Sequence, residues 1–133
     1  MKYLSDYMND KQTALFDKYC CFFAFSQKQF NEGIEKHPHI EKWCNMGNGL
    51  IAPSQYTEKV YTNLDKIYKD SILQDCYENG IDNIIIRELL NHEYCITYDL
   101  AAVIETLKDY PITEKMIKLV LKDNWKKVVD DCF

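Results

Sequence analysis

The dipeptide Asn48-Gly49 constrains the fold of this 133-residue chain more than any other local feature. It lies between two segments that can extend, 40–47 and 50–52. A two-residue turn of type I′ needs positive φ at both central residues, and Asn followed by Gly adopts it readily. The apolar run 20–25 is aromatic and too short for a helix of its own. We therefore expect a three-stranded antiparallel sheet built from about 20–25, 40–47 and 50–52.

Most of the remaining chain shows the 3.6-residue apolar period of amphipathic helices. Ser26 with Gln29 three residues later matches the capping-box pattern, and Thr113 is placed to cap the last helix. We predict about six helices, at residues 4–18, 27–35, 55–78, 83–93, 100–108 and 114–131. No Pro/Gly/Ser-rich linker interrupts them, so the expected fold is a mainly helical α+β single domain that spans residues 1–133.

The six cysteines do not indicate a zinc site or a disulfide framework, because no two of them form a Cys-x-x-Cys pair. We expect reduced, buried thiols and neither a metal nor a cofactor. The longest apolar run, 19–25, is far shorter than the ~20 residues that cross a bilayer. Residues 1–11 are polar and lack the apolar core of a signal peptide. These features predict a cytoplasmic protein without membrane contact.

The tightest ionisable cluster is Glu88, Asn91, His92 and Glu93 on one predicted helix. Glu88 and His92 are four residues apart, so the carboxylate can orient the imidazole as in a general base. Glu88, His92 and Glu93 are therefore weak catalytic candidates. Ile96 stands where the second histidine of a His-Glu-x-x-His zinc motif would be. The alternative, which we favour, is an ordinary helix end.

Arg87 is the only arginine in the chain. A guanidinium offers a planar fork that matches a carboxylate or a phosphate, whereas lysine offers a point charge. Arg87 could therefore clamp an anionic ligand. It could equally form an internal salt bridge between helices, and we favour this second alternative.

The last predicted helix carries an apolar stripe with Ile117, Leu121, Trp125 and Val128. Its lysines fall close together on a helical wheel and form a positive ridge. The ridge residues are Lys115, Lys118, Lys122 and Lys126. Such a ridge attracts an acidic partner or a phosphate-bearing ligand, although it also suits a solvated helix face. With a net charge of −5 for the chain and no arginine in the ridge, we do not expect nucleic acid as the ligand.

Several segments together resemble a family of small proteins encoded by bacteriophages and prophages. They are Ala14-Leu15-Phe16-Asp17-Lys18, Phe22-Phe23-Ala24-Phe25-Ser26-x-x-Gln29-Phe30, Met46-Gly47-x-Gly49-Leu50-Ile51-x-Pro53 and Arg87-Glu88-Leu89-x-Asn91-His92-Glu93. The resemblance runs to about Tyr110 and implies a phage accessory protein in a bacterial cytosol, with no established activity. It also draws attention to a set of binding residues that could converge on one surface: Ser26, Gln29, Gly47, Gly49, Arg87, Asn91 and His92.

The leading hypothesis is a non-enzymatic interaction protein, for instance a counter-defence factor that binds a host protein or sequesters a signalling nucleotide. One alternative is a small hydrolase or nucleotide-processing enzyme that uses His92 with Glu88 or Glu93. Another is a DNA-binding regulator that uses the lysine ridge. The expected partner is a host protein or a small anionic ligand, and a homo-oligomer is left open.

Overall fold

The computed structural model describes residues 1–129, and their contacts divide into two compact units. One unit comprises Lys2–Ser71, and the other comprises Met1 with the chain from Ile72 onward. The boundary falls inside the long helix α3 (Thr57–Asn79). The single domain expected for residues 1–133 stays a prediction.

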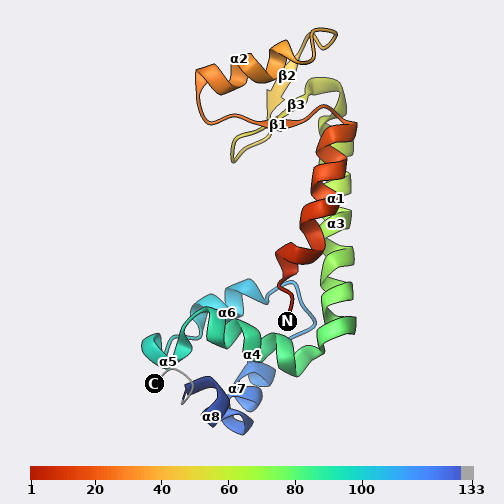
Figure 1. Ribbon diagram of the computed structural model, residues 1–133. Helices are drawn as coiled ribbons and strands as arrows, with labels where there is room; N and C mark the ends of the chain where they lie inside the picture. The colour runs from red at the N-terminus through yellow and green to blue at the C-terminus, as the bar shows by residue number, and fades with distance from the viewer. Residues whose placement is uncertain (130–133) are drawn as a thin grey trace. The chain divides into compact units, whose positions relative to one another are not determined.

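The unit Lys2–Ser71 contains two helices, a small sheet and the beginning of α3 (Figure 1). Its elements in chain order are α1 (Leu4–Lys18), β1 (Phe22–Phe23), α2 (Gln27–Glu35), β2 (Trp43–Asn45), β3 (Leu50–Pro53) and the short 3-10 helix η1 (Ser54–Tyr56). Helix α2 packs against β1. The strands are shorter than predicted, but the three-stranded antiparallel sheet is confirmed.

The sheet has the strand order β1-β3-β2, so β3 is the central strand. Phe22 pairs with Ile51 on one side of β3, and Cys44 pairs with Ala52 on the other. All four residues of β3 are buried, which is expected of a strand with a neighbour on each side and side chains covered on both faces.

Local chemistry explains the turn and the start of α2. Asn48 and Gly49 have φ values of 54° and 82°, as a type I′ turn requires, and the Leu50 amide donates to the Gly47 carbonyl at 3.0 Å. At α2, the Ser26 hydroxyl accepts from the Gln29 amide at 3.2 Å. The Gln29 side chain in turn accepts from the Phe25 amide at 2.7 Å. The predicted cap is therefore present, although Gln29 reaches one residue further back than the usual capping box.

The second unit is helical throughout its described part. It holds the end of α3, α4 (Ile81–Asn91), α5 (Tyr94–Thr97), α6 (Ala101–Thr106), α7 (Glu114–Asp123) and α8 (Trp125–Val129). Helix α4 contacts each of α5, α6, α7 and α8 and is the centre of the unit. The fully buried side chains around it are Ile84, Ile85, Leu89, Val103, Leu107, Ile117 and Val128.

Two helix predictions need correction in this unit. Residues 95–98 were expected to form a break between two helices, but residues 94–97 form the short helix α5. The single helix expected at 114–131 is interrupted at Asn124, whose side chain donates to the Val120 carbonyl at 2.9 Å. The backbone amide of Asn124 donates to the same carbonyl, also at 2.9 Å, and α8 then starts afresh. Residues 130–131 of that prediction lie outside the described residues.

The cysteines differ from the prediction of buried, reduced thiols. Cys20, Cys21, Cys44 and Cys76 are free, but none of the four is buried and Cys44 is exposed. Cys95 is buried and takes part in a disulfide. Among the helices that the structure describes, none is both long enough and apolar enough to cross a membrane.

Candidate functional site

The structure places the lone arginine in the interior of the second unit. Six consecutive residues of α4, from Ile84 to Leu89, are buried, so Arg87 and Glu88 are carried inside with the apolar residues around them. Each of the two is only 5% exposed. Because a buried charge is costly unless it is paired, both side chains need partners within the fold.

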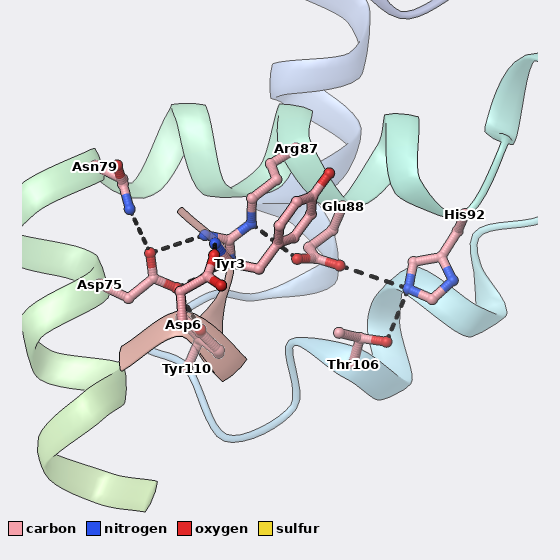
Figure 2. Close-up of polar contacts among 9 residues, drawn as sticks. All are labelled: Tyr3, Asp6, Asp75, Asn79, Arg87, Glu88, His92, Thr106 and Tyr110. Carbon is pink, nitrogen blue, oxygen red and sulfur yellow. Dashed lines mark hydrogen bonds and ion pairs between the residues drawn. The ribbon is translucent and has the colours of Figure 1, made fainter. Parts of the chain in front are cut away.

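The main partner of Arg87 is Asp75, from the end of α3. The two terminal nitrogens of the guanidinium donate to the two carboxylate oxygens of Asp75 at 2.8 and 2.9 Å, and its Nε donates to Glu88 Oε1 at 2.9 Å (Figure 2). This is the bidentate geometry that gives arginine its advantage over lysine. The lone arginine thus forms the internal salt bridge between helices that we favoured.

Two neutral side chains complete the coordination of Asp75. The Tyr110 hydroxyl donates to Oδ2 at 2.5 Å, and the Asn79 amide donates to Oδ1 at 2.7 Å (Figure 2). Asp75 is fully buried and Tyr110 is 6% exposed. The carboxylate therefore joins α3, α4 and the loop before α7.

The pKa values of these groups follow from this packing. Burial alone would raise the pKa of Asp75, but the hydrogen bonds from Arg87, Tyr110 and Asn79 outweigh it and hold the pKa below its usual value. The pKa of Tyr110 is raised, first by burial and then by its bond to Asp75. For Arg87, burial opposes the charge, yet the bonds to Asp75 and Glu88 raise its pKa. The pair therefore remains charged.

His92 lies at the end of α4, beside the outer end of this cluster. Its Nε2 is 3.0 Å from the Thr106 hydroxyl and 3.6 Å from Glu88 Oε2 (Figure 2). A nucleophile–histidine–acid relay uses the two ring nitrogens for two different partners. Here both partners approach the same nitrogen, which anchors the ring between α4 and α6. This geometry gives no specific support to catalysis by His92, and the hydrolase alternative stays a prediction.

Asn91 and Glu93, the remaining members of the predicted α4 cluster, are both exposed. Glu93 has a left-handed backbone with φ of 53°. Among the described residues, no three His, Cys, Asp or Glu side chains gather into a group that could hold a metal ion.

The predicted lysine ridge is distributed over two helices. Lys115, Lys118 and Lys122 line one open groove on α7, together with Glu114 and Leu119. Lys126 is exposed but belongs to α8, beyond the break at Asn124. The prediction required all four lysines to lie on one continuous helix. It is wrong on this point, because Lys126 lies on a separate helix.

A second groove lies next to these lysines, and we call it the lysine–tryptophan groove. It has a volume of about 460 Å³ and is lined by Tyr94, Leu100, Lys118, Leu121, Lys122 and Trp125. Trp125 is 44% exposed, although the sequence pattern placed it on the buried stripe. Its ring and the two leucines give the groove apolar lining, and the two lysines add positive charge to it.

The two lysines of this groove are available to pair with acidic groups of another molecule. Lys118 pairs with Glu114 at 3.2 Å, but both side chains are largely exposed, so water screens this pair. Lys122 is exposed and forms no ion pair with a described residue. The groove therefore offers net positive charge beside exposed aromatic and aliphatic surface.

The short helix α5 brings Tyr94 to this groove at a cost in backbone energy. Glu93 and Tyr98, the residues on either side of α5, both have φ of 53° and are not glycine. A non-glycine residue in this region costs ~1–3 kcal/mol. Here each of the two follows a helix end: the Glu93 amide donates to the Leu90 carbonyl, and the Tyr98 amide donates to the Tyr94 carbonyl. Tyr94 and Tyr98 contact each other edge to face at 5.7 Å, and Tyr98 remains 59% exposed.

The binding residues predicted in the other unit have local structural roles. Ser26 and Gln29 cap α2, as described above. Gly47 and Gly49 supply positive φ in the β2–β3 turn, and a Cβ at Gly49 would collide with the Phe25 ring. The strand end and the turn therefore do meet in this unit, while Asn91 and His92 belong to the other one.

Sequence reasoning missed the partners of Arg87 and most of the groove. Asp75 and Tyr110 are 12 and 23 residues from Arg87 along the chain, so no local spacing links them. A signal for Asp75 was its place on α3 one turn after the buried Ile72, where an apolar residue is expected. For the groove, the signal was the pair Tyr94 and Tyr98 at helical spacing.

Residues 4–130 match the model of a family of unknown function (DUF7659), and the chain therefore belongs to this family. The match agrees with the coarser part of the resemblance, a family without an assigned activity. No curated protein and no solved structure matches the chain.

Proposed function

We propose that this chain is a non-enzymatic interaction protein that binds an acidic partner protein through the lysine–tryptophan groove. The observation that carries the proposal is the combination of an exposed Trp125 with two lysines that have no buried acid of their own. Tryptophan and tyrosine are enriched among the residues that dominate binding energy at protein interfaces. The lysines add selectivity and faster association for a partner of opposite charge.

The shape of the groove favours a macromolecule over a small ligand. Small-molecule sites enclose most of the ligand surface, whereas this groove is a shallow surface formed along α7 and α8 with Tyr94 and Leu100 at its side. An amphipathic helix with acidic residues next to apolar anchors would fit an apolar lining with two lysines.

The wider setting of the proposal is a bacteriophage accessory protein in the bacterial cytosol, with a host protein as the partner. The resemblance of the Phe22–Phe30, Met46–Pro53 and Arg87–Glu93 segments to phage and prophage proteins supports this setting. Interference with a host defence factor is one role that such binding would serve.

Affinity capture with matched variants tests the proposal. The wild-type chain, Lys118→Gln/Lys122→Gln, and Trp125→Ala are each used to capture proteins from a bacterial lysate. Lys59→Gln/Lys66→Gln is the control, because it removes the same charge from exposed positions of α3. We expect one acidic protein to be recovered by the wild type and the control, and to be reduced more than ~10-fold with either groove variant.

Equal recovery of that protein with the groove variants would contradict the proposal. A mobility-shift assay with duplex DNA addresses the remaining alternative for the lysines. Binding that weakens steeply with salt and with the Lys118→Gln/Lys122→Gln change would favour the DNA-binding regulator instead.

A further inference from the structure

The unit Lys2–Ser71 carries a groove of a different character, which we call the aromatic groove. It has a volume of about 470 Å³ and lies among α1, β1, the β2–β3 turn and the first part of α3. Its main lining residues are Phe16, Phe23, Met46, Asn48, Leu50 and Tyr61. All residues that line it are uncharged, although 28% of the chain is charged.

Aromatic side chains gather at and beside this groove, and three of them are at least half exposed. Phe23 packs edge to face on Phe16 at 5.5 Å and stacks in parallel with Phe25 at 6.3 Å. Phe25 in turn lies against Gly49, where an added Cβ would come within 2.4 Å of the Phe25 ring. The exposed fractions are 50% for Phe23, 75% for Phe25 and 70% for Tyr61.

Exposed aromatic surface of this extent is characteristic of an interface. Single exposed apolar residues are ordinary, but a contiguous group marks a place that is covered in the working state of a protein. The lining also has the composition of an interface core, which is rich in Phe, Tyr and Met and depleted of charge.

We propose that the aromatic groove is a self-association surface, and that it is covered by the same groove of a second copy of this chain. In a two-fold symmetric interface the same patch faces itself, so each charged group near the axis would meet a like charge. An uncharged patch avoids this repulsion in a chain whose net charge is −5. Pairing the lysine–tryptophan groove with itself would instead bring Lys118 and Lys122 of both copies into one positively charged interface.

Sedimentation velocity with charge-introducing variants tests this inference. Tyr61→Glu and Tyr61→Lys place a charge in the groove at a largely exposed position of α3, so neither change disturbs the core. Tyr77→Glu is the control, because Tyr77 is on the same helix, is 92% exposed and does not line the groove. All variants carry Cys44→Ser, which prevents disulfide exchange through this exposed thiol without a reducing agent that would break the disulfide of Cys95.

We expect the wild type and Tyr77→Glu to form dimers in a concentration-dependent manner. Each Tyr61 variant should raise the dissociation constant at least ~10-fold while leaving the circular dichroism spectrum unchanged. An equimolar mixture of Tyr61→Glu and Tyr61→Lys should recover dimers at low salt, because opposite charges then face each other.

A wild type that stays monomeric over about two orders of magnitude in concentration would overturn the inference. A dimer that persists in both Tyr61 variants, or that is lost in Lys118→Gln/Lys122→Gln, would also overturn it. None of these outcomes decides whether the lysine–tryptophan groove binds an acidic partner, so the two proposals fail separately.

Discussion

The buried Arg87 cluster and the lysine–tryptophan groove lie in the same unit but use charge in opposite ways. In the cluster, Arg87 has two carboxylates, Asp75 and Glu88, within 2.9 Å. In the groove, Lys122 forms no ion pair with a described residue, and Lys118 pairs only with the exposed Glu114. The fold depends on both members of a buried ion pair, because the loss of one leaves the other buried without a counter-charge. Exposed charges beside apolar surface are available to a partner.

This difference also separates the two kinds of positively charged side chain that the sequence singled out, the lone arginine and the lysines of the last predicted helix. Arg87 could have bound an anionic ligand, but its guanidinium is already paired with the carboxylate of Asp75. The lysines were plausible solvated side chains, but two of them border an exposed tryptophan. The comparison predicts that changes in the cluster affect stability and that changes in the groove affect binding.

The largest effect is expected for Arg87→Met. The substitution keeps the apolar length of the side chain but leaves two buried carboxylates without their cation. We expect a loss of ~3–5 kcal/mol in the free energy of unfolding, measured with urea. The control is Lys69→Met, which removes an exposed ion pair with Asp65 and should change stability by less than ~1 kcal/mol. A similar small change for Arg87→Met would show that the buried pair contributes little.

A smaller loss is expected for Tyr110→Phe. This change removes only the hydroxyl that donates to Asp75 at 2.5 Å and leaves the ring in place. A hydrogen bond to a charged group contributes ~1.5–3 kcal/mol, so urea unfolding should show a loss in that range. If the variant were as stable as the wild type, Asp75 would need no donor from the loop before α7.

The pH dependence of stability should show a further contribution from Asp75. Its pKa is lower in the folded chain than in the unfolded chain, so the folded state favours the ionised carboxylate. The stabilisation is complete above the unfolded pKa of about 3.9 and is lost as the pH falls through the lower folded pKa. Urea unfolding between about pH 5 and pH 2 should be less pH-dependent in Asp75→Asn. An unchanged slope would contradict the assignment.

The smallest effect on stability is expected for Lys118→Gln/Lys122→Gln. Both lysines are exposed and glutamine is an adequate helix former, so the free energy of unfolding should change by less than about 0.5 kcal/mol. A loss comparable to that of Arg87→Met would mean that these lysines support the fold, and the contrast between the two regions would disappear.

Local features of the fold were predictable from the sequence, because their causes are local. The Asn48-Gly49 turn and the Ser26 cap each depend on residues within four positions of one another. The break at Asn124 was missed, because the apolar period continues through it and only the bond to Val120 reveals it. The strands were overestimated, because residues that can extend pair only where a partner strand is present.

The site was less predictable, because its contacts join distant parts of the chain. The spacing of Glu88 and His92 indicated their proximity, and the structure places them 3.6 Å apart. Nothing in the spacing indicated that the Thr106 hydroxyl would also contact Nε2 of His92. Nor did it indicate that Asp75 would pair with Arg87. Trp125 is the first residue of the separate helix α8 and is exposed. The prediction assumed one continuous helix, and its apolar stripe therefore placed Trp125 on the buried side.

The most direct test of the central claim is calorimetric titration of the captured acidic partner against the wild type and Lys118→Gln/Lys122→Gln. We predict that the dissociation constant rises at least ~10-fold in the variant, a difference of about 1.4 kcal/mol, while its unfolding midpoint stays the same. An unchanged dissociation constant would contradict the claim that the lysine–tryptophan groove is where this chain binds its partner.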